Sequence, residues 1–273
     1  MFFLYLFQIE FMNLDLTGKR AVVCGSTQGI GKASAIELAA LGANVTLLAR
    51  DKVKLKSVLK ELPVVKPEQV HTSLVADFNS PETLHATIEK YAKGKTIHVL
   101  VNNTGGPPAG LAIDATSEEF IRAFSNHLLC NQILVQAVVP GMKKVGYGRI
   151  INIISTSVKI PIRGLGVSNT IRGAVANWAK TLSIELAPFG ITVNNILPGA
   201  TMTGRLESIL KTKAEKSKKS VEEAKQEMIS EIPAGRIADP MEVAAAVAFL
   251  ASPAAGYING INVPVDGGRT GSL

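Results

Sequence analysis

Short runs of β-branched and leucine residues alternate along this chain with longer segments whose apolar residues recur at helical spacing. This alternation is typical of parallel strands joined by crossover helices. Several of the short runs are apolar almost throughout, as strands are when helices cover both faces of a sheet. The predicted strands span residues 21–24, 44–49, 70–76, 97–102, 149–154, 191–196 and 261–265.

The longer segments predict helices, and residues that favour helix ends support their limits. Asp51 stands at a cap position, Ser80 precedes Pro81 at a first helical turn, and Gly42 and Gly190 follow helix ends. The predicted helices span about 29–42, 51–61, 80–93, 117–145, 165–189 and 239–252. Together these elements predict an α/β protein with a doubly wound parallel sheet of about seven strands and helices on both faces.

The domain organisation follows from the continuity of this pattern. No repeat of fixed period and no glycine/serine linker interrupts it, so we expect residues 12–273 to form one domain. The segment 201–238, called the lid below, is charged and long, and we expect an irregular insertion over a ligand cleft. Residues 1–11 are interpreted as an N-terminal extension from an upstream start, with a peripheral membrane or partner anchor as the alternative.

The expected location is cytoplasmic, without integral membrane insertion. The apolar run at the start of the chain is interrupted by Gln8 and Glu10, well short of the roughly 20 residues of a spanning helix, and it lacks signal-peptide features. The only two cysteines, Cys24 and Cys130, fall inside apolar segments. We expect them to be buried free thiols, which fits a reducing compartment.

The composition is that of a folded but basic protein. Hydrophobic residues make up 47% of the chain and charged residues 19%, and the net charge is +7, so an acidic partner has to be considered. Five lysines cluster in the lid with no aromatic residue among them to stack on bases, which indicates a solvated helix or lid and no nucleic-acid partner. The alternative is contact with an acidic carrier protein. The clustered lysines are Lys211, Lys213, Lys216, Lys218 and Lys219.

A glycine-rich segment joins the first predicted strand to the first helix. It reads Gly25-Ser26-Thr27-Gln28-Gly29-Ile30-Gly31. Glycines at this place let the backbone approach a diphosphate, whose charge is stabilised by free amides and by the positive end of the helix. The segment therefore predicts a dinucleotide site.

The glycine spacing, three residues and then one, resembles that of the short-chain dehydrogenase/reductase family, whose fold is of the Rossmann type. The resemblance extends over about 16–268, nearly the whole chain. The further matching motifs are Asp77, Asn102-Asn103-Thr104-Gly105, Pro198-Gly199 through Thr203, and Val265-Asp266-Gly267-Gly268. The implied cofactor contacts are Asp77 and Phe78 at the adenine, Asn103 at the adenosine ribose, and Pro198, Gly199 and Thr201 along the nicotinamide. The resemblance also implies a homodimer or homotetramer formed through the helices at 117–145 and 165–189.

The end of the second predicted strand distinguishes NADP from NAD. A carboxylate there binds the ribose hydroxyls of NAD, whereas an arginine accepts the 2′-phosphate of NADP. This chain has Ala49 at the usual acidic position and Arg50 directly after it. Because a guanidinium pairs well with phosphate, the sequence favours NADP over NAD.

The catalytic positions of the family are occupied by unusual residues. In the family a serine after the fifth strand, a tyrosine thirteen residues later and a lysine four residues beyond it act on the carbonyl. The same count here reaches Ser155, Ser168 and Arg172. A serine hydroxyl is shorter and far less acidic than a phenol, and an arginine is a poor proton relay, although it can still bind a ribose. The hydroxyl chemistry of the family is therefore altered.

One histidine stands where the family often has an asparagine. Counting back nine residues from Gln136 reaches His127, with Asn126 adjacent. A histidine titrates near neutral pH and can donate a proton, so His127 is a reserve proton source, with a packed polar helix residue as the alternative. The four histidines are widely spaced and the cysteines form no ligand pair, so no metal site is expected.

Two hypotheses of function follow from these residues. The first is an NADP-dependent oxidoreductase that acts on a carbonyl or alcohol, such as a 3-oxoacyl thioester, with a changed means of delivering the proton. The second is a dinucleotide-binding pseudoenzyme that keeps the cofactor site without turnover. The glycine segment favours cofactor binding under both hypotheses and does not discriminate between them.

Overall fold

The computed structural model describes residues 12–272, and within that range seven strands form one parallel sheet. The strands are β1 (Arg20–Cys24), β2 (Asn44–Ala49), β3 (Thr72–Val75), β4 (Val99–Asn102), β5 (Gly148–Ile153), β6 (Ile191–Pro198) and β7 (Asn262–Val265). Their order is β3-β2-β1-β4-β5-β6-β7, and all neighbours are parallel. The chain winds outward in both directions from β1 and β4, which confirms the predicted doubly wound sheet.

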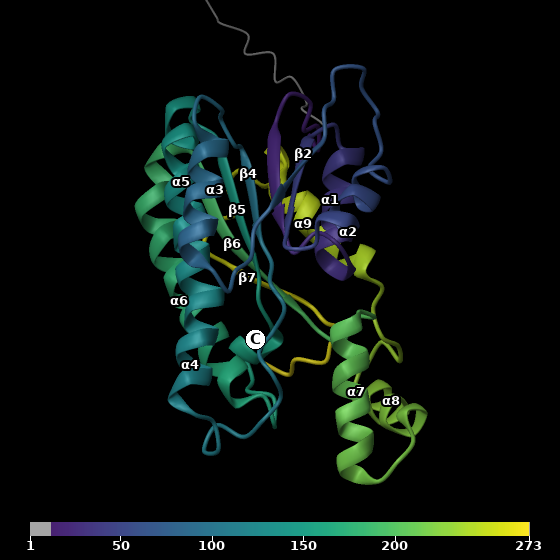
Figure 1. Cartoon of the computed structure of the whole chain (residues 1–273). Coiled ribbons are helices and arrows are strands. Elements are labelled where there is room, and N and C mark those ends of the chain that lie inside the picture. Colours follow the sequence, from purple (N-terminus) through teal and green to yellow (C-terminus); the bar gives the residue numbers. More distant parts are fainter. Residues whose placement is uncertain (1–11, 273) are drawn as a thin grey trace, which may run out of the picture.

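Helices cover both faces of this sheet (Figure 1). One face carries α1 (Gly29–Ala40), α2 (Lys52–Leu59) and α9 (Pro240–Ala251), and the other carries α3 (Pro81–Ala92), α5 (Cys130–Val145) and α6 (Gly166–Leu186). Each face has its own apolar core, with Leu38 and Val247 fully buried on the first and Leu84 and Leu134 on the second. Burial on both sides explains why most strand residues are apolar.

A row of asparagines crosses the sheet among these apolar residues. Asn102, Asn152, Asn195 and Asn262 lie at paired positions of β4, β5, β6 and β7. Each side chain joins the next by an amide hydrogen bond of 2.8–2.9 Å. Because buried amides are costly without partners, this asparagine ladder fixes the register of the four strands.

The helix expected at 117–145 is interrupted. A π-helical turn, Ser125–Leu129, separates α4 (Ser117–Phe124) from α5. A π turn accommodates one extra residue, so the faces of the two helices are out of phase. The prediction of one continuous helix is wrong here, because a single extra residue leaves no mark in the apolar spacing. His127 lies within this π turn and is buried, with 3% of its surface exposed.

The lid is regular rather than irregular, which corrects the sequence-based expectation. It consists of α7 (Gly204–Ser217) and α8 (Val221–Ser230). Side-chain caps begin both helices, since Thr203 accepts from the Leu206 amide and Ser220 forms a reciprocal pair with Glu223. Lys213 and Lys219 both pair with Glu227. The lid also has its own apolar cluster, built from Leu206, Leu210, Ala214, Ala224 and Met228.

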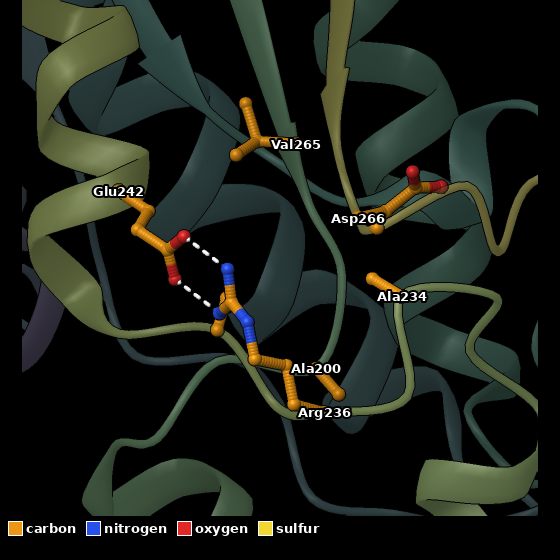
Figure 2. Close-up of a pocket in the computed structure, with 8 residues that line it drawn as sticks. Ala200, Ala234, Arg236, Glu242, Val265 and Asp266 are labelled. Atoms are coloured by element: carbon orange, nitrogen blue, oxygen red, sulfur yellow. Dashed lines mark hydrogen bonds and ion pairs between the residues drawn. The ribbon is translucent and has the colours of Figure 1, made fainter.

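The two ends of the lid are held together where it leaves the sheet. The amide of Met202 donates to the carbonyl of Ala238 and the amide of Ala238 donates to the carbonyl of Ala200, both at 2.9 Å. Next to this neck, Arg236 forms two hydrogen bonds of 2.6 and 2.7 Å with Glu242 at the start of α9 (Figure 2). These contacts surround a small cavity of about 80 Å³.

Candidate active site

A large cleft lies at the carboxyl ends of the strands, with a volume of about 1270 Å³. It runs past the carboxyl ends of β1 and β4, where the strand order reverses, which is the usual ligand site of a doubly wound sheet. The glycine segment, the loop after β4, the end of β5, α6 and the lid all contribute to its lining. The lid contributes residues of both α7 and α8 to one wall of the cleft.

The glycine segment adopts a turn that only glycines permit. Gly25 and Gly29 have φ angles of +58° and +53°, in the left-handed region. A Cβ atom on Gly31 would lie 2.3 Å from the carbonyl oxygen of Gly25. The Gln28 side chain makes no capping hydrogen bond at the start of α1. The first amides of α1 are thus left available, and their positive helix end suits a diphosphate.

Most of the predicted cofactor residues line this one cleft. Those that do are Gly25, Thr27, Gln28, Gly29, Ile30, Arg50, Asp77, Phe78, Asn103, Arg172, Pro198, Gly199 and Thr201. Ser26 and Gly31 do not line it: the Ser26 hydroxyl is fully buried and donates to the carbonyl of Leu48, and Gly31 packs against Gly25. These two residues therefore support the turn from the side that faces away from the cleft.

Asn103 connects the two central strands below the cleft. Its Nδ2 lies 3.2 Å from the carbonyl oxygen of Cys24 and 3.4 Å from that of Gly25. Both carbonyls belong to the end of β1 and the start of the glycine turn. The amide therefore holds the turn in place while the residue also lines the cleft.

The three residues at the family's catalytic positions lie together in the cleft. Ser155 follows β5, and Ser168 and Arg172 lie one turn apart on α6. Arg172 Nη1 donates to the carbonyl of Ile153 at 2.9 Å, which ties α6 to the end of β5. Burial and the positive charge of Arg205 lower the pKa of Arg172 to about 10, so its guanidinium stays charged at neutral pH.

No tyrosine of residues 12–272 reaches this cleft. The hydroxyl of Tyr147 donates to the carbonyl of Ala251 at 2.8 Å, that of Tyr91 hydrogen-bonds with Thr46, and Tyr257 is fully exposed. The phenol that the family uses is therefore not replaced by a tyrosine from another part of the described chain.

His127 stands behind the cleft wall rather than in it. Its Nδ1 lies 2.6 Å from the hydroxyl of Thr104, and Thr104 does line the cleft. Burial, with the positive charges of Arg172 and Arg205, lowers the pKa of His127 to about 2. The expectation that His127 titrates near neutral pH is therefore wrong, because an imidazolium is disfavoured in a dry, positively charged place.

Arg205 is a cleft residue that the sequence analysis missed. It is the second residue of α7, and its Nη2 donates to the carbonyl of Pro107 in the loop after β4. Burial lowers the pKa of its guanidinium. The only signal in the sequence is its position directly after Thr203-Gly204, which also line the cleft.

Three further features concern metal ions, thiols and membranes. Among the described residues there is no group of three or more His, Cys, Asp or Glu side chains placed to hold a metal ion. Cys24 and Cys130 are buried free thiols, as expected, and burial raises the pKa of both to about 12. None of the helices in residues 12–272 has the length and apolar character needed to cross a membrane.

Comparisons with known proteins agree with the glycine turn and the sheet order. A family model described as enoyl-(acyl carrier protein) reductase matches residues 25–270. The chain is 30% identical over 259 residues to the NADPH-dependent reductase BacG of Bacillus subtilis, covering 94% of this chain and 100% of that protein. It is 31% identical over 256 residues to the 3-oxoacyl-(acyl-carrier-protein) reductase FabG of Vibrio cholerae, covering 93% and 98%.

A solved structure shows the same fold. L-sorbose reductase from Gluconobacter frateurii, complexed with NADPH and L-sorbose, superposes with a TM-score of 0.88 at 29% identity, covering 96% of this chain and 100% of that one. The family model covers residues 25–270, and the alignments with the two relatives cover 94% and 93% of this chain. All of these matches include the glycine turn and the β5–α6 region. The chain belongs to the short-chain dehydrogenase/reductase family.

Proposed function

We propose that this protein is an NADP-dependent oxidoreductase that reduces a carbonyl compound to an alcohol without the phenol that its family normally uses. The observation that carries the proposal is a single cleft lined by the glycine turn, Arg50, Ser155 and Arg172. An NAD(P)-dependent oxidoreductase acting on CH–OH or C=O groups is what its relatives are named for. The substrate, a 3-oxoacyl thioester or another carbonyl compound, is part of the proposal.

The cofactor prediction, NADP, is confirmed by the NADPH-dependent relatives. The residues of this chain fit such a cofactor. The uncapped amides at the start of α1 can hold the diphosphate. The adenosine 2′-phosphate would meet Arg50, which lines the cleft, and no carboxylate occupies the position of Ala49.

The reaction requires three tasks of the chain's own residues. When bound, the nicotinamide supplies the hydride that forms the new C–H bond. The chain must orient the carbonyl, stabilise the negative charge that develops on its oxygen, and deliver one proton to that oxygen. We assign the first task to Ser155 and Ser168, whose hydroxyls can donate to the carbonyl oxygen. The second falls to Arg172, whose buried positive charge lines the cleft and can stabilise the negative charge on the carbonyl oxygen.

The proton must come by another route than the family's phenol. Thr104 presents a hydroxyl to the cleft and is hydrogen-bonded to the neutral imidazole of His127. A neutral imidazole has one N–H and one bare nitrogen, so it can pass on a proton without becoming a stable cation. We assign this pair the relay of a proton, alongside water held by Ser168.

The reductase proposal is tested by mixing the purified protein with NADPH and a panel of ketones, aldehydes and acyl thioesters. We expect NADPH absorbance to fall with at least one carbonyl compound. Calorimetric titration with NADPH measures cofactor binding separately. Tight NADPH binding without turnover across the panel would contradict the reductase and support the pseudoenzyme. No heat with either coenzyme would contradict cofactor binding itself.

Arg50→Gln should weaken NADPH binding by about 10- to 100-fold, since a hydrogen bond between charged groups contributes roughly 1.5–3 kcal/mol. NADH, which lacks the 2′-phosphate, should bind Arg50→Gln and the native protein about equally. Calorimetric titration of both coenzymes measures this. Lys54→Gln on α2 removes the same charge outside the cleft and serves as the control. Equal losses for NADPH and NADH would refute the assignment of Arg50.

We also propose that the protein is cytoplasmic and assembles as a homodimer or homotetramer through α4, α5 and α6. Exposed apolar side chains on these helices support the assembly, with Ile121 and Ile184 more than two-thirds exposed and Phe124 partly so. Such a surface is typical of a protein interface. Light scattering of the purified protein measures its mass, and a monomer at micromolar concentration contradicts the proposal.

A further inference from the structure

The charges that line the cleft are unbalanced. Two of its cations are neutralised, because Arg269 pairs with Glu231 and Lys213 pairs with Glu227. Asp77 lies at the end of the cleft that holds Arg50 and hydrogen-bonds with Asn79. Among the described residues, five cations line the cleft without an ion pair to any carboxylate: Arg50, Arg163, Arg172, Arg205 and Lys216.

Arg205 is held in place by a contact between the lid and the loop after β4. Its side chain is half-buried, and the guanidinium crosses from α7 to the loop after β4, where Nη2 donates to the carbonyl of Pro107. It also covers Gly106, since an ideal Cβ there would lie 3.5–3.7 Å from the guanidinium atoms. One hydrogen bond uses only one of its five N–H groups, so the fork that binds carboxylate or phosphate is still free.

The surroundings of Arg205 make an anion favourable there. Burial already lowers the pKa of Arg205, and its charge in turn lowers the pKa of both Arg172 and His127. A partly buried cation that has no counterion, next to a second buried cation, is destabilising. A negatively charged ligand between these two arginines would relieve that cost.

The position of Arg205 separates it from the part of the cleft that suits the adenosine. Arg50, Asp77 and Phe78 lie at the ends of β2 and β3, whereas Arg205 acts electrostatically on Arg172 and on His127, the residue behind Thr104. Arg163 lines the same cleft from the loop between β5 and α6. Three of the five unpaired cations, Arg163, Arg172 and Arg205, therefore lie on the side of the cleft where the carbonyl must be held.

We propose that the substrate is a small carbonyl compound that itself carries a carboxylate or phosphate group, and that Arg205 binds this group. The proposal rests on the proposed function, because it places the anionic group next to a carbonyl that Ser155 and Arg172 act upon. Arg205 thereby selects charged substrates and positions them as the lid covers the cleft.

The test uses matched pairs of charged and neutral ligands. Acetoacetate is compared with methyl acetoacetate, and hydroxyacetone phosphate with hydroxyacetone, each titrated calorimetrically into the protein saturated with NADP⁺. Kinetics with NADPH are measured for the same four compounds. The protein variants are Arg205→Gln, Arg205→Lys and, as a charge-matched control at the far end of β1, Arg20→Gln.

We expect the charged member of at least one pair to bind about 10- to 100-fold more tightly than its neutral partner. Arg205→Gln should remove this preference, Arg205→Lys should keep part of it, and Arg20→Gln should leave it unchanged. The pair with the larger preference identifies the anion as a carboxylate or a phosphate.

Three results would overturn the proposal. One is equal affinity for charged and neutral members of both pairs. Another is an Arg205→Gln variant that keeps the preference. The third is a loss of NADPH affinity in Arg205→Gln as large as its loss of affinity for the anion, because Arg205 would then serve the cofactor's phosphates. Preference in the calorimetry without any NADPH turnover contradicts only the reductase, whereas turnover of neutral ketones without charge preference contradicts only the anion site.

Discussion

Replacing Ser168 with tyrosine and Arg172 with lysine together should raise the rate of carbonyl reduction by roughly 10²-fold or more. A positioned acid or base contributes about 10²- to 10⁴-fold, and the double variant would place a phenol and an ammonium one helical turn apart in the cleft. Ser168 lines the cleft, so a larger side chain at this position would extend toward it. Steady-state NADPH oxidation by the double variant and by the native protein measures the gain.

The matched control is Ser168→Phe with Arg172→Lys, which has the same ring without its hydroxyl. We expect no gain from this control, since a phenyl ring cannot donate a proton. The pH profile gives a second readout: the pKa of about 2 for His127 and of about 10 for Arg172 leave both groups in one charge state between these values. A phenol–ammonium pair should introduce a new ionisation into the profile. A double variant no faster than an efficient native enzyme would show that Ser168 and Arg172 already suffice.

Asn152→Leu should lower the free energy of unfolding by about 4 kcal/mol. The Asn152 side chain is fully buried at the centre of the asparagine ladder, and its loss leaves the amides of Asn102 and Asn195 each without one partner. An unsatisfied buried polar group costs roughly 1–3 kcal/mol. Urea denaturation without cofactor measures the change, since NADPH binding would itself add stability.

Asn262→Leu is the graded comparison for this prediction. Asn262 lies at the edge of the ladder, is only half-buried and joins a single neighbour, Asn195. We expect its replacement to cost about 1 kcal/mol, the usual net value of one hydrogen bond. Should both variants lose the same small amount of stability, the ladder would not fix the strands as we infer.

The strands and the strand-end motifs were the predictable parts of this protein. The apolar run predicted at 149–154 corresponds to β5 with a shift of one residue, because burial on both faces leaves little freedom for polar residues. The run predicted at 70–76 was too long, since Val70 is a β-branched residue in an exposed loop. The glycine turn was predictable because strand, turn and helix are adjacent in the sequence.

The rest of the site depends on contacts between distant residues. Arg205 reaches Pro107 across about a third of the chain, and Thr104 hydrogen-bonds with His127, which lies in a π turn that the apolar spacing does not reveal. The regular lid helices were missed because their caps and lysine–glutamate pairs act locally, whereas the sequence shows mainly an interruption of the strand–helix alternation. These parts of the site depend on the packing of distant segments, which the pattern within any single element does not reveal.

The pinned neck of the lid restricts how substrate enters and leaves. Since backbone hydrogen bonds join residues 200–202 to Ala238, and since α7 and α8 share one apolar cluster, we expect any movement of the two helices to occur as one rigid unit. Arg205 belongs to α7, and its guanidinium hydrogen-bonds with the carbonyl of Pro107 in the loop after β4. Under the proposal above, one side chain would have two partners at once: Arg205 would hold the lid to the loop after β4 through the Pro107 carbonyl and bind the anionic group of the substrate with its remaining N–H groups.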